Sequence, residues 1–146
     1  MLLIKGFAGF LASFGFAILL NVRKKHIFLA GLNGALGSIC YFALMDYQIT
    51  SEAIAIFVAS LLVSIISEVM ARTFKCPTTI FLSCAIIPLV PGGKLYYTML
   101  AIINNNLEEF MYLLIGTIAD AGAIVIASAI VGSFIKMINR LSTNRG

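Results

Sequence analysis

The 146-residue sequence has few charged side chains and no tryptophan. Charged residues make up 11% and hydrophobic residues 61%, whereas ordinary soluble domains are about 25% charged. A soluble domain of this length has too much surface for its volume to bury so many apolar side chains. The sequence therefore predicts an integral membrane protein with one transmembrane domain, residues 1–146, and no soluble domain of useful size.

Residues that could form disulfides, metal sites or catalytic centres are also scarce. The three cysteines, Cys40, Cys76 and Cys84, are an odd number without metal-type spacing, so neither a disulfide framework nor a zinc site is expected. The single histidine, His26, lies in a basic turn, where we expect it to be solvated. No phosphate-binding glycine loop, metalloprotease motif or nucleophile–base pair occurs. The sequence therefore predicts that the chain is not an enzyme and that it uses neither a cofactor nor a metal ion.

Long apolar runs, which are what the sequence has in abundance, predict helices that cross a membrane. A crossing helix needs about 20 mostly apolar residues, and the continuous runs do not alternate as barrel strands do. A cleaved signal peptide is disfavoured for the first run, since its basic cluster follows the apolar stretch instead of preceding it. The predicted spans are Leu2–Leu20, Ile27–Met45, Ala53–Ala71 and Phe110–Phe134, together with a broken fifth stretch at Thr78–Asn104.

The loops between these spans differ in charge. Eight of the ten basic residues fall on one side, including the Arg23–Lys25 cluster, Arg72 and Lys75. The acidic loop residues fall on the other side and are Asp46, Glu52, Glu108 and Glu109. Basic loops stay in the cytoplasm, so the N-terminus is predicted outside and the C-terminus inside. The net charge of +4 reads as this topology signal and not as a nucleic-acid surface, because the basic residues lie in short clusters between apolar runs.

The stretch Thr78–Asn104 is interrupted by Pro88, Pro91, Gly92 and Gly93. Proline removes a backbone donor and clashes with the preceding turn, and glycine adds conformational freedom. The pieces on either side would each cross about half of the hydrocarbon layer, which puts the break near the midplane. Broken helices form substrate sites in many transporters. A kink that serves packing, or an outer loop without a ligand, is the alternative.

At this break the sequence resembles a known family. The stretch IIPLVPGG, with Arg72 and Pro77 before it and Tyr97 after it, looks like the signature of the threonine/serine exporter family, and LLNVRKKHIFLAGLNGALG resembles that family's first turn and second span. More narrowly, the chain is similar to the small five-span subunit of the split form. The resemblance covers most of the chain.

The resemblance implies the following function. The chain would be a subunit of an exporter of threonine/serine-type amino acids or C4 dicarboxylates, in the bacterial cell membrane, acting with a larger homologous five-span subunit or as a homo-oligomer. Its implied site residues are Pro88, Pro91, Gly92 and Tyr97. A membrane scaffold whose partner does all the transport is the alternative. No nucleic-acid partner is expected.

Three ionisable residues lie inside the apolar runs. Glu68, Lys94 and Asp120 each carry an insertion cost of about 2.5–3.5 kcal/mol and are expected to face the protein interior or a cavity. Asp120 shares a helix face with Gly116, about ten residues into the last span. It could carry a coupling proton for transport, with Lys94 and Gly93 beside it in the substrate path, or it could be a structural partner of Lys94.

Glu68 forms a polar stripe with Arg72, four residues later. The two side chains can pair along the helix, as a structural pair or as a gate at the cytoplasmic end. In the second span, Gly31, Gly34 and Gly37 predict a tight packing surface, beside which Asn33 needs a partner on another helix.

Overall fold

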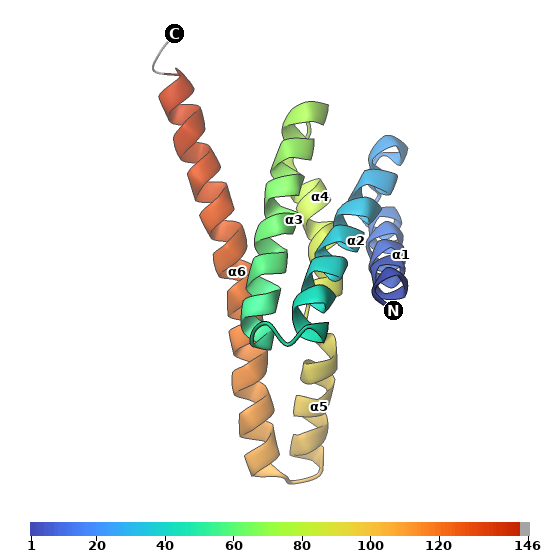
Figure 1. Ribbon diagram of the computed structural model, residues 1–146, viewed down its shortest axis with the longest axis vertical. Coiled ribbons are helices and arrows are strands. Elements are labelled where there is room, and N and C mark those ends of the chain that lie inside the picture. The colour runs from blue at the N-terminus through green and yellow to red at the C-terminus, as the bar shows by residue number, and fades with distance from the viewer. Residues whose placement is uncertain (144–146) are drawn as a thin grey trace.

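The computed structural model describes residues 1–143, and the side chains as far as residue 138. Every regular element in this part of the chain is helical (Figure 1). The elements are α1 (Leu2–Leu19), α2 (Lys24–Asp46), α3 (Glu52–Phe74), α4 (Thr78–Ile86), the 3₁₀ turn η1 (Ile87–Leu89), α5 (Gly92–Ile103) and α6 (Leu107–Thr143).

Four of these helices, α1, α2, α3 and α6, are long and apolar enough to cross a membrane. The pair formed by α4–η1 and α5 adds a fifth if it counts as one span. The predicted helical membrane protein is therefore confirmed, with four or five candidate spans. The last helix exceeds the predicted span by three residues at its start, and it continues nine residues past Phe134.

Helices α1 and α2 approach closely because small residues interlock between them. A Cβ added to Gly34 of α2 would collide with the hydroxyl of Ser13, and one added to Gly9 of α1 would collide with the hydroxyl of Ser38. A Cβ on Gly31 would lie 2.7 Å from the Phe10 ring. The predicted tight packing surface on the second span is confirmed, and it belongs to the contact with α1 as well as to that with α3.

Asn33 finds the partner that the sequence required. Its side-chain nitrogen donates hydrogen bonds to the Ser67 hydroxyl at 2.8 Å and to the Val63 carbonyl at 3.2 Å, both on α3. Asn33 and Ser67 are fully buried. Because no water competes at such a site, this contact fixes the register of α2 against α3.

His26 does not have the solvated position predicted for it. The ring is only 8% exposed and lies between Phe74 of α3 and Phe81 of α4, with ring centroids 5.1 and 5.6 Å away. The first turn of α2, which carries His26, therefore lies at the end of the core formed by Ala17, Ala30 and Cys84. The basic neighbours of His26 stay exposed, so the charge pattern of the turn gave no sign of its burial.

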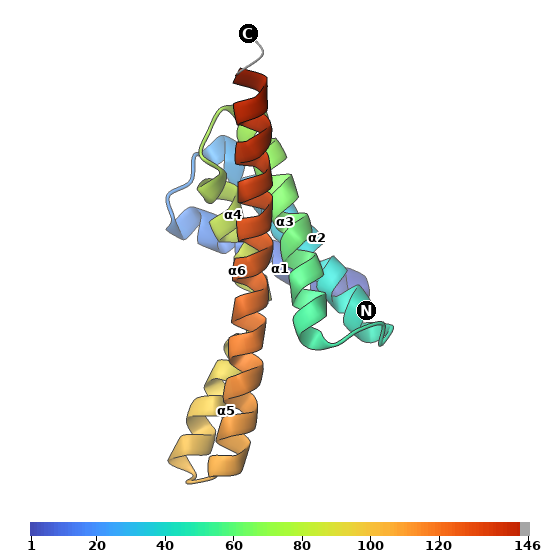
Figure 2. The same ribbon diagram turned by 90° about the vertical axis from the view of Figure 1, so that its left-hand side faces the viewer.

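The helices are not all level with one another. The turns that carry Arg23–Lys25 and Lys75 gather at one end, which we call the basic end, and the α2–α3 turn lies at the opposite end of α1–α3 (Figure 1). Helix α5 and the first part of α6 extend well beyond that α2–α3 turn, as two perpendicular views agree (Figures 1 and 2). Within the described residues, α5 packs mainly against α6.

Candidate functional site

The interruption between α4 and α5 brings Lys94 against α6. After η1 the chain turns by 52°, and α5 starts with the Leu95 amide bonded to the Pro91 carbonyl at 3.1 Å. From there Thr98 and Ala101 are buried along the helix. Thr98 lies 3.5 Å from Thr117 of α6, hydroxyl to hydroxyl. Lys94 lies one turn before Thr98, so its ammonium reaches the same helix.

The ammonium of Lys94 binds two carboxylates from two different helices. Its Nζ lies 2.5 Å from Oδ2 of Asp120 on α6 and 2.8 Å from Oε2 of Glu52, the first residue of α3. The side chain of Asp120 is 2% exposed, whereas those of Lys94 and Glu52 are 25% and 35% exposed. The Tyr41 hydroxyl of α2 donates to the other Glu52 oxygen at 3.3 Å. We call Glu52, Lys94 and Asp120 the charged triad.

The charged triad has one ammonium and two carboxylates, so it bears one net negative charge when all three groups are ionised. Burial disfavours an uncompensated charge. Either a proton on one carboxylate or a cationic group of a ligand would neutralise the triad. The arrangement therefore offers a donor for an anionic group and acceptors for a cationic group within one small region.

A cavity of about 280 Å³ opens beside the triad. Its lining includes the charged side chains of Glu52 and Lys94, and the other lining residues belong to α6. Sites for drug-sized ligands measure about 300–1,000 Å³, so this space suits a smaller molecule. The lining residues are Glu52, Lys94, Tyr112, Leu113, Ile115 and Gly116.

The residues expected to form a substrate path are only partly brought together. Lys94 and Asp120 meet, as the sequence allowed, and Pro88 and Pro91 frame the interruption. Gly92 and Gly93 are exposed at the start of α5, with nothing within 4 Å of an added Cβ. Tyr97 is 58% exposed, meets the Tyr96 ring edge to face, and is not among the residues that line the cavity.

The sequence predicts that the break and Asp120 lie near the midplane of the membrane, and this depth stays a prediction. Within the bundle, Lys94 reaches the first residue of α3, so the charged triad is level with that end of the helix. Asp120 is the fourteenth residue of α6. The buried face of α6 also differs from the expected one and follows Thr117, Asp120, Ile124, Ala127 and Val131.

Glu68 and Arg72 lie far from the triad, near the basic end. Both line an open hollow of about 380 Å³, together with Lys75 and the turn into α4. Direct pairing of Glu68 with Arg72, and a role as a gate, stay predictions.

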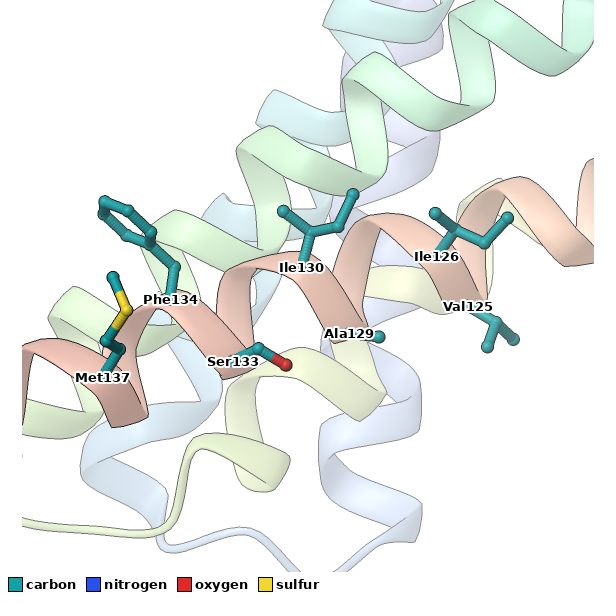
Figure 3. A pocket seen from close by; sticks show the side chains of 7 residues that line it. All are labelled: Val125, Ile126, Ala129, Ile130, Ser133, Phe134 and Met137. Carbon is teal, nitrogen blue, oxygen red and sulfur yellow. The ribbon is translucent and has the colours of Figure 1, made fainter.

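A larger hollow of about 560 Å³ lies along the second half of α6 (Figure 3). Its walls include Val125, Ile130 and Phe134, and Ser133 supplies a hydroxyl. Such a surface suits lipid chains or the apolar side chains of another helix and offers no charge to a polar metabolite.

Sequence reasoning missed Glu52, Tyr41 and Tyr112. Glu52 was classed with the acidic loop residues, because it follows a polar turn at the start of its apolar run. The distance of Glu52 from Lys94 and Asp120 along the chain does not indicate that the three side chains meet. The one signal in the sequence is that Glu52 lies in the first turn of a span, where an acidic side chain can reach a neighbouring helix.

Comparison with known proteins gives one match to a family and none to a structure. The family model described as "Threonine/Serine exporter, ThrE" matches residues 5–134. The match includes all three residues of the charged triad and the interruption before α5. No solved structure matches the chain.

Proposed function

Because the chain belongs to the threonine/serine exporter family, whose members are transporters, we propose that it is one subunit of an exporter of small polar metabolites. It acts as a multi-pass protein of the bacterial cell membrane, as a single transmembrane domain. The observation that carries the proposal is the charged triad beside a small cavity. A protein that only holds its partner in place has no need for a cavity with charged walls.

The charges of the triad suit a zwitterionic amino acid better than a dicarboxylate. Lys94 can bind the carboxylate of the substrate, while Glu52 or Asp120 accepts from its ammonium group. A C4 dicarboxylate would bring two negative charges to a triad that already carries one. Hydroxy amino acids such as threonine and serine are therefore the proposed substrates, and dicarboxylates are the second choice.

Proton uptake is the proposed coupling step. While both carboxylates are ionised they compete with the substrate for the Lys94 ammonium. A proton on Asp120 ends its attraction for Lys94 and leaves that ammonium free for the substrate carboxylate. Binding of substrate and binding of a proton then favour each other, which is what a proton-coupled transporter needs.

The proposed topology has five crossings, with α4–η1 and α5 together as the broken fourth span, the N-terminus outside and the basic end in the cytoplasm. Five spans are few for a transporter that acts alone, and many such proteins place the site between two repeats. The proposed partner is a larger homologous five-span subunit, so this chain is the smaller half of a split exporter. Purified alone into liposomes, it is expected to give no efflux.

Efflux of labelled threonine from liposomes that contain the native complex tests the proposal. Asp120→Asn is expected to lower efflux at least tenfold and to flatten its dependence on pH. The matched control is Asp46→Asn, which removes the partner of Lys5 on the outer turn and leaves the cavity intact. Wild-type efflux with unchanged pH dependence in Asp120→Asn would remove the proton role.

The start of α5 is tested in the same assay with Gly92→Leu. A side chain at Gly92 meets no neighbour, so the protein should fold, and efflux should fall if the path passes this point. Gly15→Leu on α1 is the control, since Gly15 has equally open surroundings. Equal efflux from the two variants would place the path elsewhere.

Cysteine accessibility separates a transport subunit from a scaffold. Cysteines placed at positions 92, 93, 116 and 123 should react with a water-soluble reagent if they line a path. Protection of all four positions, in a complex that still exports, would favour the scaffold.

A further inference from the structure

The two carboxylates of the charged triad differ in their access to the cavity. Glu52 is one of the residues that line the cavity, and its side chain is 35% exposed. Asp120 is not a lining residue, and its side chain is 2% exposed. A ligand in the cavity can therefore touch Glu52 and Lys94 directly, whereas Asp120 acts on it through the Lys94 ammonium that it binds.

Both oxygens of Glu52 accept a hydrogen bond, each from a different helix. Oε2 accepts from the Lys94 ammonium of α5 at 2.8 Å, and Oε1 accepts from the Tyr41 hydroxyl of α2 at 3.3 Å. The second contact is long for a bond between two oxygens, so it contributes less than the ion pair. Together the two contacts fix the direction in which the Glu52 carboxylate points.

Tyr41 is well placed to fix that direction, because its ring is held from several sides. The ring lies edge to face with that of Phe42, with centroids 5.0 Å apart. It also packs against a core from α3, α4 and η1, whose buried members are Ala59, Val63, Ala85 and Leu89. Tyr41 does not line the cavity, so it influences a ligand there only through Glu52.

The charges that remain at the cavity after proton uptake match an amino acid. When Asp120 takes up the proton of the proposed coupling step, the cavity lining keeps one ammonium, that of Lys94, and one carboxylate, that of Glu52. A zwitterion brings one carboxylate and one ammonium, so each charge meets an opposite one. A monoanion of the same shape would leave Glu52 without a cationic partner.

We propose that Glu52 is the specificity-determining residue that binds the ammonium group of the substrate, and that Tyr41 is the positioning residue that aims Glu52 at it. The inference deepens the proposed function and rests on it, since it assigns two tasks to two carboxylates. Glu52 selects substrates with a free amino group, and Asp120 carries the proton without touching the substrate. The ligand class is thus the small α-amino acids.

Competition for binding to the purified native complex tests this assignment. Labelled threonine is displaced by unlabelled threonine or by β-hydroxybutyrate, which keeps the carboxylate, hydroxyl and methyl groups of threonine and lacks its ammonium group. The amino-group preference is the ratio of the two concentrations that displace half of the label. Glu52→Gln should lower this preference about tenfold, because a charged acceptor becomes a neutral one.

The other variants separate positioning from recognition. Tyr41→Phe keeps the ring, loses the bond to Glu52, and should lower the preference about threefold. In a chain that already carries Glu52→Gln it should have no further effect, because Tyr41 acts through that carboxylate. Asp120→Asn should keep the preference. Tyr47→Phe, on a side chain that is 74% exposed, is the control for loss of a tyrosine hydroxyl.

Glu52→Asp guards against a trivial loss of structure, since it keeps the charge on a shorter arm and should retain more of the preference than Glu52→Gln. Equal losses in these two variants, or a preference that depends on Asp120 and not on Glu52, would overturn the recognition role. Independent effects of Tyr41→Phe and Glu52→Gln would overturn the positioning role. Threonine efflux by the wild-type complex is measured separately. Its absence would refute the exporter assignment together with this inference, whereas normal efflux with an unchanged preference in Glu52→Gln would refute the inference alone.

Discussion

A Cβ built on Gly116 of α6 would lie 3.6 Å from the ammonium nitrogen of Lys94. Gly116 is one turn before Asp120, so the lysine side chain crosses the space that a larger residue would fill on its way to the buried carboxylate. The absence of a side chain at Gly116 therefore keeps open both the cavity and the route from Lys94 to Asp120.

This relationship predicts a size limit at position 116. Gly116→Ala should export at a rate within about twofold of the wild type, because 3.6 Å is an ordinary van der Waals contact. Gly116→Leu should lower threonine efflux at least tenfold, because its side chain occupies the cavity beside Lys94. The amount of each variant in the membrane is measured alongside. Equal efflux by Ala and Leu variants would show that the cavity is not part of the path.

The two carboxylates of the charged triad should differ in their contribution to stability. Asp120→Asn removes a charged hydrogen bond from a nearly fully buried side chain and should cost about 2 kcal/mol. Glu52→Gln affects a side chain that is 35% exposed and should cost less than about 1 kcal/mol. Thermal unfolding of the purified variants in one detergent gives the order. A larger loss in Glu52→Gln would contradict it.

The interlock of α1 and α2 predicts a clash that a second substitution relieves. Gly34→Ala puts a methyl group into the space of the Ser13 side chain and should destabilise the protein by about 1–3 kcal/mol. Ser13→Gly in the same chain should recover most of that loss, because it empties the contested space. Gly15→Ala is the control, since an added Cβ meets no neighbour there. A Gly34→Ala variant as stable as the control would show that the helices separate at little cost.

Reporter fusions test the topology. Fusions at positions 48, 74, 106 and 146 should read outside, inside, outside and inside, because the basic turns are retained in the cytoplasm. As a control for an effect of the reporter itself, the Arg23–Lys25 charges are moved to the α2–α3 turn. This change should weaken the preference for the predicted orientation. A reporter that reads outside at position 146 is incompatible with five crossings that start from an N-terminus outside.

The spans were predictable because each one depends on a local property of the chain. Continuous apolar runs define α1, α2, α3 and α6, and Pro88 with Pro91 marks where a helix must stop. Gly34 and Asn33 could also be interpreted from one helix alone, since a small residue permits close approach and a buried amide requires a partner. Each of these features is decided within a single span.

Features that depend on how two helices are aligned were not predictable. Nothing in the sequence sets the height of α6 relative to α3, so the sequence gives no sign that Asp120 is level with Glu52. The meeting of Glu52 with Lys94 follows from that alignment and was missed for the same reason. The burial of His26 likewise depends on Phe74 and Phe81, which come from two other helices.

Helix α6 runs from Leu107 to Thr143 without a proline, so it behaves as one stiff rod. Helix α3 packs against the middle of α6, and α5 packs against its first turns. Pivoting about that middle hold by about 10° would shift either end by roughly 4–5 Å, given an arm of about 25–30 Å. A displacement of one end of α6 would thus be accompanied by an opposite displacement of its other end, with the contact to α3 as the fulcrum.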